Sequence, residues 1–210
     1  MLTVLLIRHA SCDHIGRRIA GRAAGTHLNG LGRAQAARLA RALAQGRGQN
    51  SLFGPGLEAL YSGPLERARE TAEILAAPLG LSVVEAPGLD ELDFGEWTGK
   101  TLDELDADPR WQAFNTSRAE TRIPGGELMS EAVDRALDEL ARMERRHHGG
   151  AVCAVSHGDV IRGVLLRCLR TPLDEVHRLE VAPASVSLVQ ILDGEPLRAL
   201  AINWTPDLSE

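Results

Sequence analysis

The sequence predicts an α/β fold of three layers, a sandwich in which helices cover both faces of a mostly parallel central sheet. Short apolar runs alternate with amphipathic segments, and this alternation is typical of parallel strands joined by crossover helices. The 210 residues are 44% hydrophobic and 25% charged, which suits a globular chain that buries its own core. We expect a single domain over residues 1–210, with a small helical insertion, here called the cap segment, at about 87–126.

The first predicted element is a strand over residues 2–7, a short apolar run that contains valine and isoleucine. Asn29 is a residue type that caps helices, and it precedes a predicted helix over about 30–46 with apolar positions three or four residues apart. The stretch 45–56 is rich in Gly, Gln and Asn, so we expect a loop there.

A second strand is predicted over residues 57–61. A helix follows from Gly63-Pro64, because proline fits the first turn of a helix, and its apolar positions continue to Leu79. The third predicted strand, at 81–84, is short.

The regular pattern is interrupted between Pro87 and Gly126. This cap segment contains turn residues, two tryptophans and short helical pieces near 101–106 and 109–115. Such a composition favours an insertion beside the core over an element of the central sheet.

The last part of the chain returns to the alternating pattern. A long amphipathic helix is predicted over about 127–146, followed by a buried strand at 151–156 and a helix at 159–169. Two late strands, at about 184–192 and 197–203, complete the sheet.

Charged and polar side chains follow the predicted strands, where open α/β sheets form their functional sites. Arg8 and His9 come directly after the first strand, and His157 comes after the strand that precedes the last helix. Arg67 lies one turn into the helix that follows the second strand. We therefore expect two histidines and two arginines at one edge of the sheet.

This group of side chains suits a tetrahedral dianion. Guanidinium groups match phosphate oxygens, and helix N-termini add backbone N–H donors. A neutral imidazole is also a nucleophile, and neighbouring guanidiniums lower its pKa. The leaving oxygen needs an acid, and the candidates crowd together at Asp90, Glu91, Asp93 and Glu96.

These residues lie in blocks that resemble the histidine phosphatase superfamily, which includes the cofactor-dependent phosphoglycerate mutases. The resemblance extends over about residues 1–165, and six blocks occur in the family's order. They are Leu6 to Ala10; Gly21-Arg22 with Leu28-Asn29, Gly32 and Gln35-Ala36; Tyr61 to Ala68 with Thr71-Ala72; Glu91 to Trp97 with Gly99; Pro124 to Glu127; and Ser156 to Gly158.

The resemblance implies a role for each of five residues. His9 would be the nucleophile that becomes phosphohistidine. Arg8, Arg67 and His157 would hold the phosphoryl oxygens, and Glu91 would protonate the leaving oxygen and then activate water. Neither a metal nor another cofactor is implied, because arginines supply the charge stabilisation.

Three more residues are candidates for substrate contacts, namely Ser11, Arg22 and Gly158. Ser11 is expected to supply a donor, whereas Arg22 has the alternative of being a solvated loop residue. Ala10 stands where the family usually has glycine, so we expect its methyl group to narrow the floor of the pocket.

Three functions are compatible with these residues. The first is a phosphomonoester hydrolase that acts through phosphohistidine on small phosphorylated metabolites, a metal-independent phosphatase of the histidine acid type. The second is a phosphoglycerate mutase, and the third is a non-catalytic phosphate-binding module. The stretch from Glu91 to Pro124 is shorter than the insertion implied for mutases, which favours the phosphatase. The presence of all five chemical residues disfavours the binding module.

Composition narrows the partners and the compartment. The net charge of −6 argues against nucleic acid and anionic membrane surfaces. The opening apolar run is too short for a signal peptide or a membrane span. The three cysteines form no C-x-x-C pair and are expected to be free thiols, so we expect a cytoplasmic protein. A homodimer is an expectation at the level of the family.

Overall fold

The central sheet has six strands in a computed structural model that describes residues 1–46, 56–192 and 197–206. The strands are β1 (Leu2–Arg8), β2 (Leu57–Ser62), β3 (Val83–Glu85), β4 (Ala151–Ser156), β5 (Val186–Ile191) and β6 (Arg198–Trp204). Their order in the sheet is β3-β2-β4-β1-β5-β6. β1 to β4 are parallel to one another, and β5 is antiparallel to both of its neighbours. The predicted mostly parallel sheet is confirmed.

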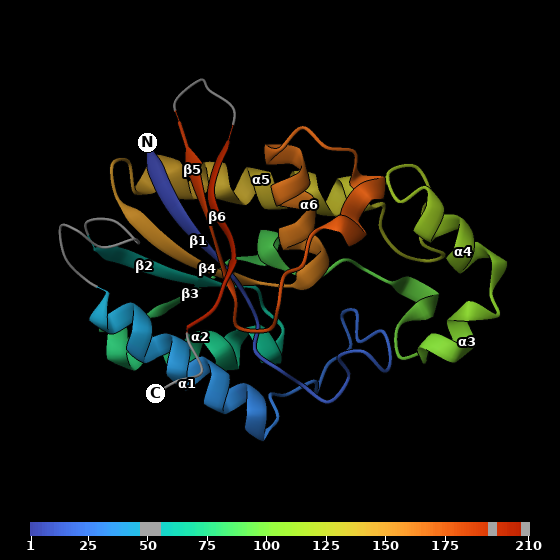
Figure 1. The fold of residues 1–210 in the computed structure, drawn as a ribbon, viewed down its shortest axis with the longest axis horizontal. Coiled ribbons are helices and arrows are strands. Elements are labelled where there is room, and N and C mark those ends of the chain that lie inside the picture. The colour runs from blue at the N-terminus through green and yellow to red at the C-terminus, as the bar shows by residue number, and fades with distance from the viewer. Residues whose placement is uncertain (47–55, 193–196, 207–210) are drawn as a thin grey trace.

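Helices cover both faces of this sheet. The α-helices are α1 (Gly30–Gln45), α2 (Glu66–Leu79), α3 (Leu102–Asp106), α4 (Pro109–Thr116), α5 (Met129–Arg146) and α6 (Gly158–Cys168), and the 3₁₀ helices are η1 (Pro87–Leu89), η2 (Gly95–Trp97) and η3 (Leu173–Arg178). Figure 1 shows α1 and α2 on one face and α5 and α6 on the other. The predicted three-layer α/β architecture is therefore present.

The alternating side chains of β1 build two cores at once. Leu5 and Ile7 pack with α1 and α2, whereas Val4 and Leu6 pack with α5 and α6. Because β1 lies inside the sheet and is buried on both faces, nearly every position must be apolar. Burial of each large apolar side chain contributes about 1.5–3 kcal/mol to folding. This strand therefore holds the residues at its carboxyl end in a fixed place.

The helix starts differ in detail from the predictions. Asn29 caps α1 as expected, since its side chain accepts from the backbone N–H of Gly32 at 2.8 Å. The next helix begins at Glu66, two residues later than predicted. The backbone N–H of Gly63 donates to Val155 of β4 at 3.0 Å, so the chain is still tied to the sheet after β2.

Other boundaries move by one or two residues. The third strand and the two late strands shift by that amount, and α5 starts two residues later than predicted. The 3₁₀ helix η3 was not predicted, because it lacks a regular apolar period. Most of the loop predicted at 45–56 lies outside the described residues.

The cap segment has its own hydrophobic cluster. Figure 1 shows α3 and α4 beside the sheet, away from the strands. The cluster contains both tryptophans of the segment, Trp97 and Trp111, whose rings meet edge to face with centroids 5.2 Å apart. Ile19, from the loop after β1, packs against it. The loop and the cap segment are also joined by backbone hydrogen bonds, including that from Gly99 to the Ile19 carbonyl at 2.7 Å.

No helix in the described part of the chain has the length and apolarity that a membrane crossing requires. Cys12, Cys153 and Cys168 form no disulfide bonds, as the sequence predicts.

The packing of α6 on α5 gives a testable prediction about stability. Gly163→Ala would normally stabilise a helix by about 1 kcal/mol. Here a β-carbon on Gly163 would overlap Cγ2 of Val133, so we expect a loss of about 1–3 kcal/mol in the free energy of unfolding by urea.

Two further variants check the cause of that loss. Val133→Ala combined with Gly163→Ala should be more stable than the sum of the single effects predicts. Gly30→Ala, at a position with open space around it, should show no such loss. Equal effects of Gly163→Ala in both backgrounds would contradict the proposed overlap.

Candidate active site

Three strand ends bring two histidines and two arginines into one place. Arg8 ends β1 and His9 follows it, whereas His157 follows β4. Arg67 is the second residue of α2, after β2, and its side chain is buried. The rings of His9 and His157 have their centroids 5.1 Å apart. The structure thus places these four predicted residues together at the carboxyl edge of the sheet.

Hydrogen bonds assign the proton of the His9 imidazole. Nδ1 lies 2.8 Å from the carbonyl oxygen of Ala10, and a carbonyl only accepts, so Nδ1 is the atom that donates. Nε2 therefore has the free lone pair, and Nε of Arg67 donates to it at 3.3 Å. This is the tautomer that a nucleophilic Nε2 requires.

Several donors at this site lack a partner in the protein. Arg8 donates from Nη1 to the Val181 carbonyl at 2.6 Å, and Arg67 donates from Nη2 to the Gly21 carbonyl at 2.7 Å. Within the described chain, Nε of Arg8, Nη1 of Arg67 and both ring nitrogens of His157 are buried and make no hydrogen bond. Buried polar groups cost free energy when unpaired, so this set suits an anion with several oxygens.

Burial keeps both imidazoles neutral. It lowers the pKa of His9 well below its usual value, and the charges of Arg67 and Arg8 add to this effect. The pKa of His157 is lowered for the same reasons, by burial first and then by Arg67. His9 therefore keeps its lone pair at neutral pH.

Glu91 faces this cationic group from the cap segment. One of its carboxylate oxygens lies 3.9 Å from Nδ1 of His157. Burial, together with repulsion from Asp159, raises the pKa of Glu91 to about 7, against a smaller opposing effect of Arg67. A carboxyl group with this pKa can donate a proton near neutral pH and accept it back later.

The other candidate acids pair with arginines outside the pocket lining, and one oxygen of Asp90 also lies 3.9 Å from Nε2 of His157. Arg22 forms ion pairs with Asp90, Asp93 and Glu127, at 3.4, 3.8 and 2.9 Å. Glu96 is exposed and pairs with Arg110. Among these carboxylates, Glu91 lines the pocket.

Arg135, on α5, holds the backbone around Glu91. It donates to the carbonyl oxygens of Gly88, Asp90 and Glu91 at 2.7–2.9 Å and also pairs with Glu127. Arg22 donates to the Glu91 carbonyl as well, at 2.8 Å. No local sequence pattern predicts this role of Arg135, because the three carbonyl groups that it contacts are more than 40 residues away.

The pocket has a volume of about 160 Å³ and is lined by His9, Arg8, Arg67, Glu91 and Gly158, among others. The remaining three candidates for substrate contacts, Ser11, Arg22 and His157, lie outside its lining, and the His157 side chain is fully buried. Arg22 holds the acidic segment, as described above, and the backbone N–H of Ser11 donates to Gln35 at 3.0 Å.

Ala10 does not narrow the floor of the pocket, contrary to the expectation from the sequence. It is fully buried and packs in the core between the sheet, α1 and α2. Its backbone N–H donates to Thr71 Oγ1 at 3.0 Å. The methyl group is therefore accommodated on the core side of the loop.

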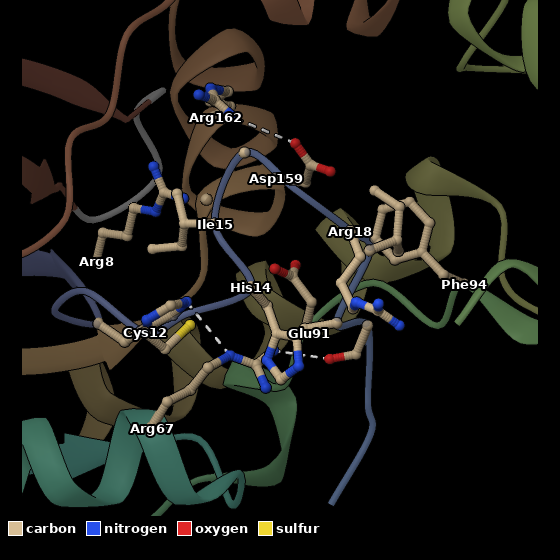
Figure 2. A pocket seen from close by; sticks show the side chains of 16 residues that line it. Arg8, Cys12, His14, Ile15, Arg18, Arg67, Glu91, Phe94, Asp159 and Arg162 are labelled. Atoms are coloured by element: carbon tan, nitrogen blue, oxygen red, sulfur yellow. Dashed lines mark hydrogen bonds and ion pairs between the residues drawn. The ribbon is translucent and has the colours of Figure 1, made fainter. Parts of the chain in front are cut away.

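Further polar side chains line the pocket without having been predicted. His14 and Arg18 come from the loop after β1, and Asp159 and Arg162 come from the first turns of α6. Figure 2 shows Asp159 and Arg162 at the end of the pocket away from Arg67. Their i, i+3 spacing directly after His157 is a signal that sequence analysis could have used. Among the described residues, no three His, Cys, Asp or Glu side chains gather as a metal site would require.

Comparison with known proteins agrees with this geometry. The sequence model of the histidine phosphatase superfamily (branch 1) matches residues 4–205. Phosphoglycerate mutase-like protein 4 of Arabidopsis thaliana is 30% identical over 91% of this chain and 80% of its own length. Metal-independent phosphoserine phosphatase of Arabidopsis thaliana is 32% identical over 90% of this chain and 76% of its own length.

A solved structure shares the fold over nearly the whole chain. It is that of mycobacterial glucosyl-3-phosphoglycerate phosphatase Rv2419c with VO3, at a TM-score of 0.81 and 26% identity, and the match covers 98% of this chain and 99% of that one. The family match, the two relatives and the strand-end geometry agree with one another. The chain therefore belongs to the histidine phosphatase superfamily.

Proposed function

We propose that the protein hydrolyses phosphomonoesters of small metabolites through a phosphohistidine at His9. The observation that best supports this is the lone pair of His9 Nε2, which lies among the unpaired donors of Arg8, Arg67 and His157. A nucleophile surrounded by donors suits attack on a phosphoryl group, whose oxygens need charge stabilisation as the transition state forms.

In the first step, Nε2 of His9 attacks phosphorus, and the bond from phosphorus to the ester oxygen breaks. The proton of the Glu91 carboxyl group moves to that leaving oxygen. Arg67 exchanges its contact with Nε2 for a phosphoryl oxygen, while Arg8 and His157 hold the others. The bond from Nδ1–H to the Ala10 carbonyl keeps the ring in its reactive tautomer.

In the second step, water attacks the phosphohistidine. The Glu91 carboxylate takes a proton from this water, and the bond between phosphorus and nitrogen breaks. Inorganic phosphate leaves, and both His9 and Glu91 return to their first states. The same carboxyl group therefore serves as acid and then as base, which suits its pKa of about 7.

The mutase alternative has the same catalytic residues, and the cap segment distinguishes the two. The cap segment supplies Glu91 and Phe94 to the pocket lining, and neither is a cation. A bisphosphorylated intermediate would need positive charge from above the site. None of the described cap residues that line the pocket supplies such a charge, and this favours hydrolysis by water.

The nucleophile can be tested by trapping the intermediate. Mixing the protein with a radiolabelled phosphate ester and quenching in base should leave an acid-labile, base-stable label. His9→Ala should abolish this label and nearly all hydrolysis, because the attacking lone pair belongs to Nε2 of His9. His27→Ala, at an exposed position, should label normally. Full labelling of His9→Ala would disprove the assignment.

The role of Glu91 as the acid can be tested with esters whose leaving groups differ in their need for a proton. Glu91→Gln should slow hydrolysis of alkyl phosphates about 10²–10⁴-fold, because an alkoxide needs a proton as it leaves. Phosphorylation by p-nitrophenyl phosphate should be affected far less, and labelled protein should accumulate because water is no longer activated.

The pH dependence checks the same assignment. In the unmodified protein, kcat/KM for an alkyl phosphate should fall as the pH rises above about 7, where Glu91 loses its proton. Glu91→Gln should lack this descending limb. Glu96→Gln, an exposed neighbour, is the control and should keep the full profile. A normal alkyl phosphatase rate in Glu91→Gln would show that another carboxyl group is the acid.

Arg135 should act on catalysis through Glu91. Arg135→Gln removes the donors to three carbonyl groups of the acidic segment, so we expect a loss of alkyl phosphate hydrolysis that exceeds the loss with p-nitrophenyl phosphate. Arg142→Gln, on the exposed side of the same helix, is the matched control. Equal losses with both esters would indicate a general effect on folding instead of a displaced acid.

A further inference from the structure

Two carboxyl groups of the pocket have opposite surroundings. Asp159, in the first turn of α6, and Glu91, from the cap segment, both line the pocket (Figure 2). Asp159 forms ion pairs with Arg118 and Arg162, at 3.5 and 3.2 Å. In the part of the chain that the structure describes, Glu91 forms no ion pair with an arginine, and the neutral His157 lies 3.9 Å from it. The two reaction steps give no role to the carboxylate of Asp159.

Arg118 is a buried arginine that reaches from the cap segment to α6. Its side chain is 4% exposed, and its guanidinium lies over the Phe114 ring, 4.6 Å from the ring centroid. Nη2 donates to Oδ1 of Asn115 at 2.8 Å and to Nε2 of His177 at 3.3 Å. These contacts fix the side chain, and Nη1 donates to Oδ2 of Asp159. The buried charge of Arg118 therefore favours an ionised Asp159.

The surrounding charges favour opposite protonation states for the two carboxyl groups. Burial by itself would raise the pKa of Asp159, but the charges of Arg118, Arg162 and Arg8 lower it below its usual value. Burial and the charge of Asp159 instead raise the pKa of Glu91 to about 7. When two carboxyl groups share a site, the one with cationic partners stays ionised and the other takes the proton.

The effect of Asp159 on Glu91 opposes that of the nearby arginines. The other charged or titratable side chains around the two carboxyl groups come from the strand ends, the helices and the loop after β1, and they are Arg8, Arg67, Arg22, Asp90, Arg135, His157 and His177. Among them, Arg67 and Arg8 lower the pKa of Glu91. Asp159 thus supplies the negative charge that counteracts these two arginines.

We propose that Asp159 is a positioning residue for the hydrolysis, and that its negative charge, fixed by Arg118 and Arg162, keeps the transferable proton on Glu91. This inference rests on the proposed phosphatase function. In the first step the charge favours the form of Glu91 that can protonate the leaving oxygen. After that transfer both carboxyl groups are ionised, and their repulsion favours the return of a proton from the attacking water to Glu91.

The test follows the protonation of Glu91 directly in the complete protein. Glutamate labelled with ¹³C at the side-chain carboxyl carbon gives a signal that shifts on titration, and the Glu91 signal is the one that Glu91→Gln removes. Asp159→Asn keeps the shape of the side chain and removes its charge. We expect the titration midpoint of Glu91 to fall by about one pH unit in this variant.

The activity of Asp159→Asn should change in parallel with this midpoint. The descending limb of kcat/KM for an alkyl phosphate should move to lower pH by the same amount, so that the rate at alkaline pH falls about tenfold. The rate with p-nitrophenyl phosphate should change far less, because its leaving group needs little protonation. A purely structural role of Asp159 would reduce both rates and leave the position of the limb unmoved.

Two further variants control for the removed charge and for folding. Asp134→Asn removes an exposed carboxylate that pairs with Arg167, and it should keep both the midpoint and the limb in place. Asp159→Asn leaves two arginines without their carboxylate, which is a cost to folding. Arg118→Gln combined with Asp159→Asn removes both members of the buried pair, and this double variant should also lower the midpoint.

The outcomes separate the two proposals. Hydrolysis of the esters together with a Glu91 midpoint that is unchanged or higher in Asp159→Asn would overturn the role of Asp159 and leave the phosphatase function standing. If Asp159→Asn fails to fold, the same result in the double variant is the contradicting one. A lower midpoint with an unmoved limb would also overturn the role. No hydrolysis of any ester by the unmodified protein would overturn the phosphatase function itself, and this inference with it.

Discussion

The contact between the buried Arg67 guanidinium and Nε2 of His9 is the interaction on which the rest of the site depends. Its charge adds to burial in keeping the imidazole neutral, and with the Ala10 carbonyl it fixes which nitrogen has the lone pair. A guanidinium at a helix N-terminus opposes the helix dipole, and its burial adds a desolvation cost. The two cores on either side of β1 supply the stability that offsets this cost. The buried positive charge of the site is therefore unfavourable without a ligand, and a bound phosphoryl group would compensate it.

Four arginines near the pocket divide into two pairs with different roles. Arg8 and Arg67 face the pocket with donors that have no protein partner, whereas Arg135 and Arg22 turn away from it and hold the backbone and carboxylates of the acidic segment. Contacts outside the pocket thus fix the backbone of Glu91. One oxygen of its carboxyl group accepts from the backbone N–H of Leu92 at 2.9 Å, and the other faces His157. The separation allows a negative group to remain beside a cluster of cations without forming a tight ion pair that would lower its pKa.

Sequence analysis located the fold and the centre of the site because both depend on local patterns. The apolar run before Arg8-His9 and the apolar run before His157 predict strand ends, and parallel strands bring their ends together. The contacts of Arg22 and Arg135 with the acidic segment were not foreseen, because most of their partners there are distant in the sequence and depend on how the loop after β1 and α5 pack. The orientation of the Ala10 methyl group likewise depends on the core beneath it. Local residue types therefore identify the candidate reacting groups, and tertiary packing decides which residues support them.

The backbone hydrogen bonds between the loop after β1 and the cap segment have a consequence for how the family diversifies. Arg18 pairs with Thr101 in an isolated bridge, and Ile19 exchanges hydrogen bonds with Lys100 and Gly99. The loop after β1 and the cap segment form two walls of the pocket and are bonded to each other. The residues at the bottom of the pocket belong to the carboxyl edge of the sheet. An insertion or substitution in either segment is therefore expected to shift both walls of the pocket, while the strand ends that position His9 and His157 stay in place. With the walls and the strand ends separate in this way, changes in the walls can alter which metabolites bind while the reacting residues stay the same.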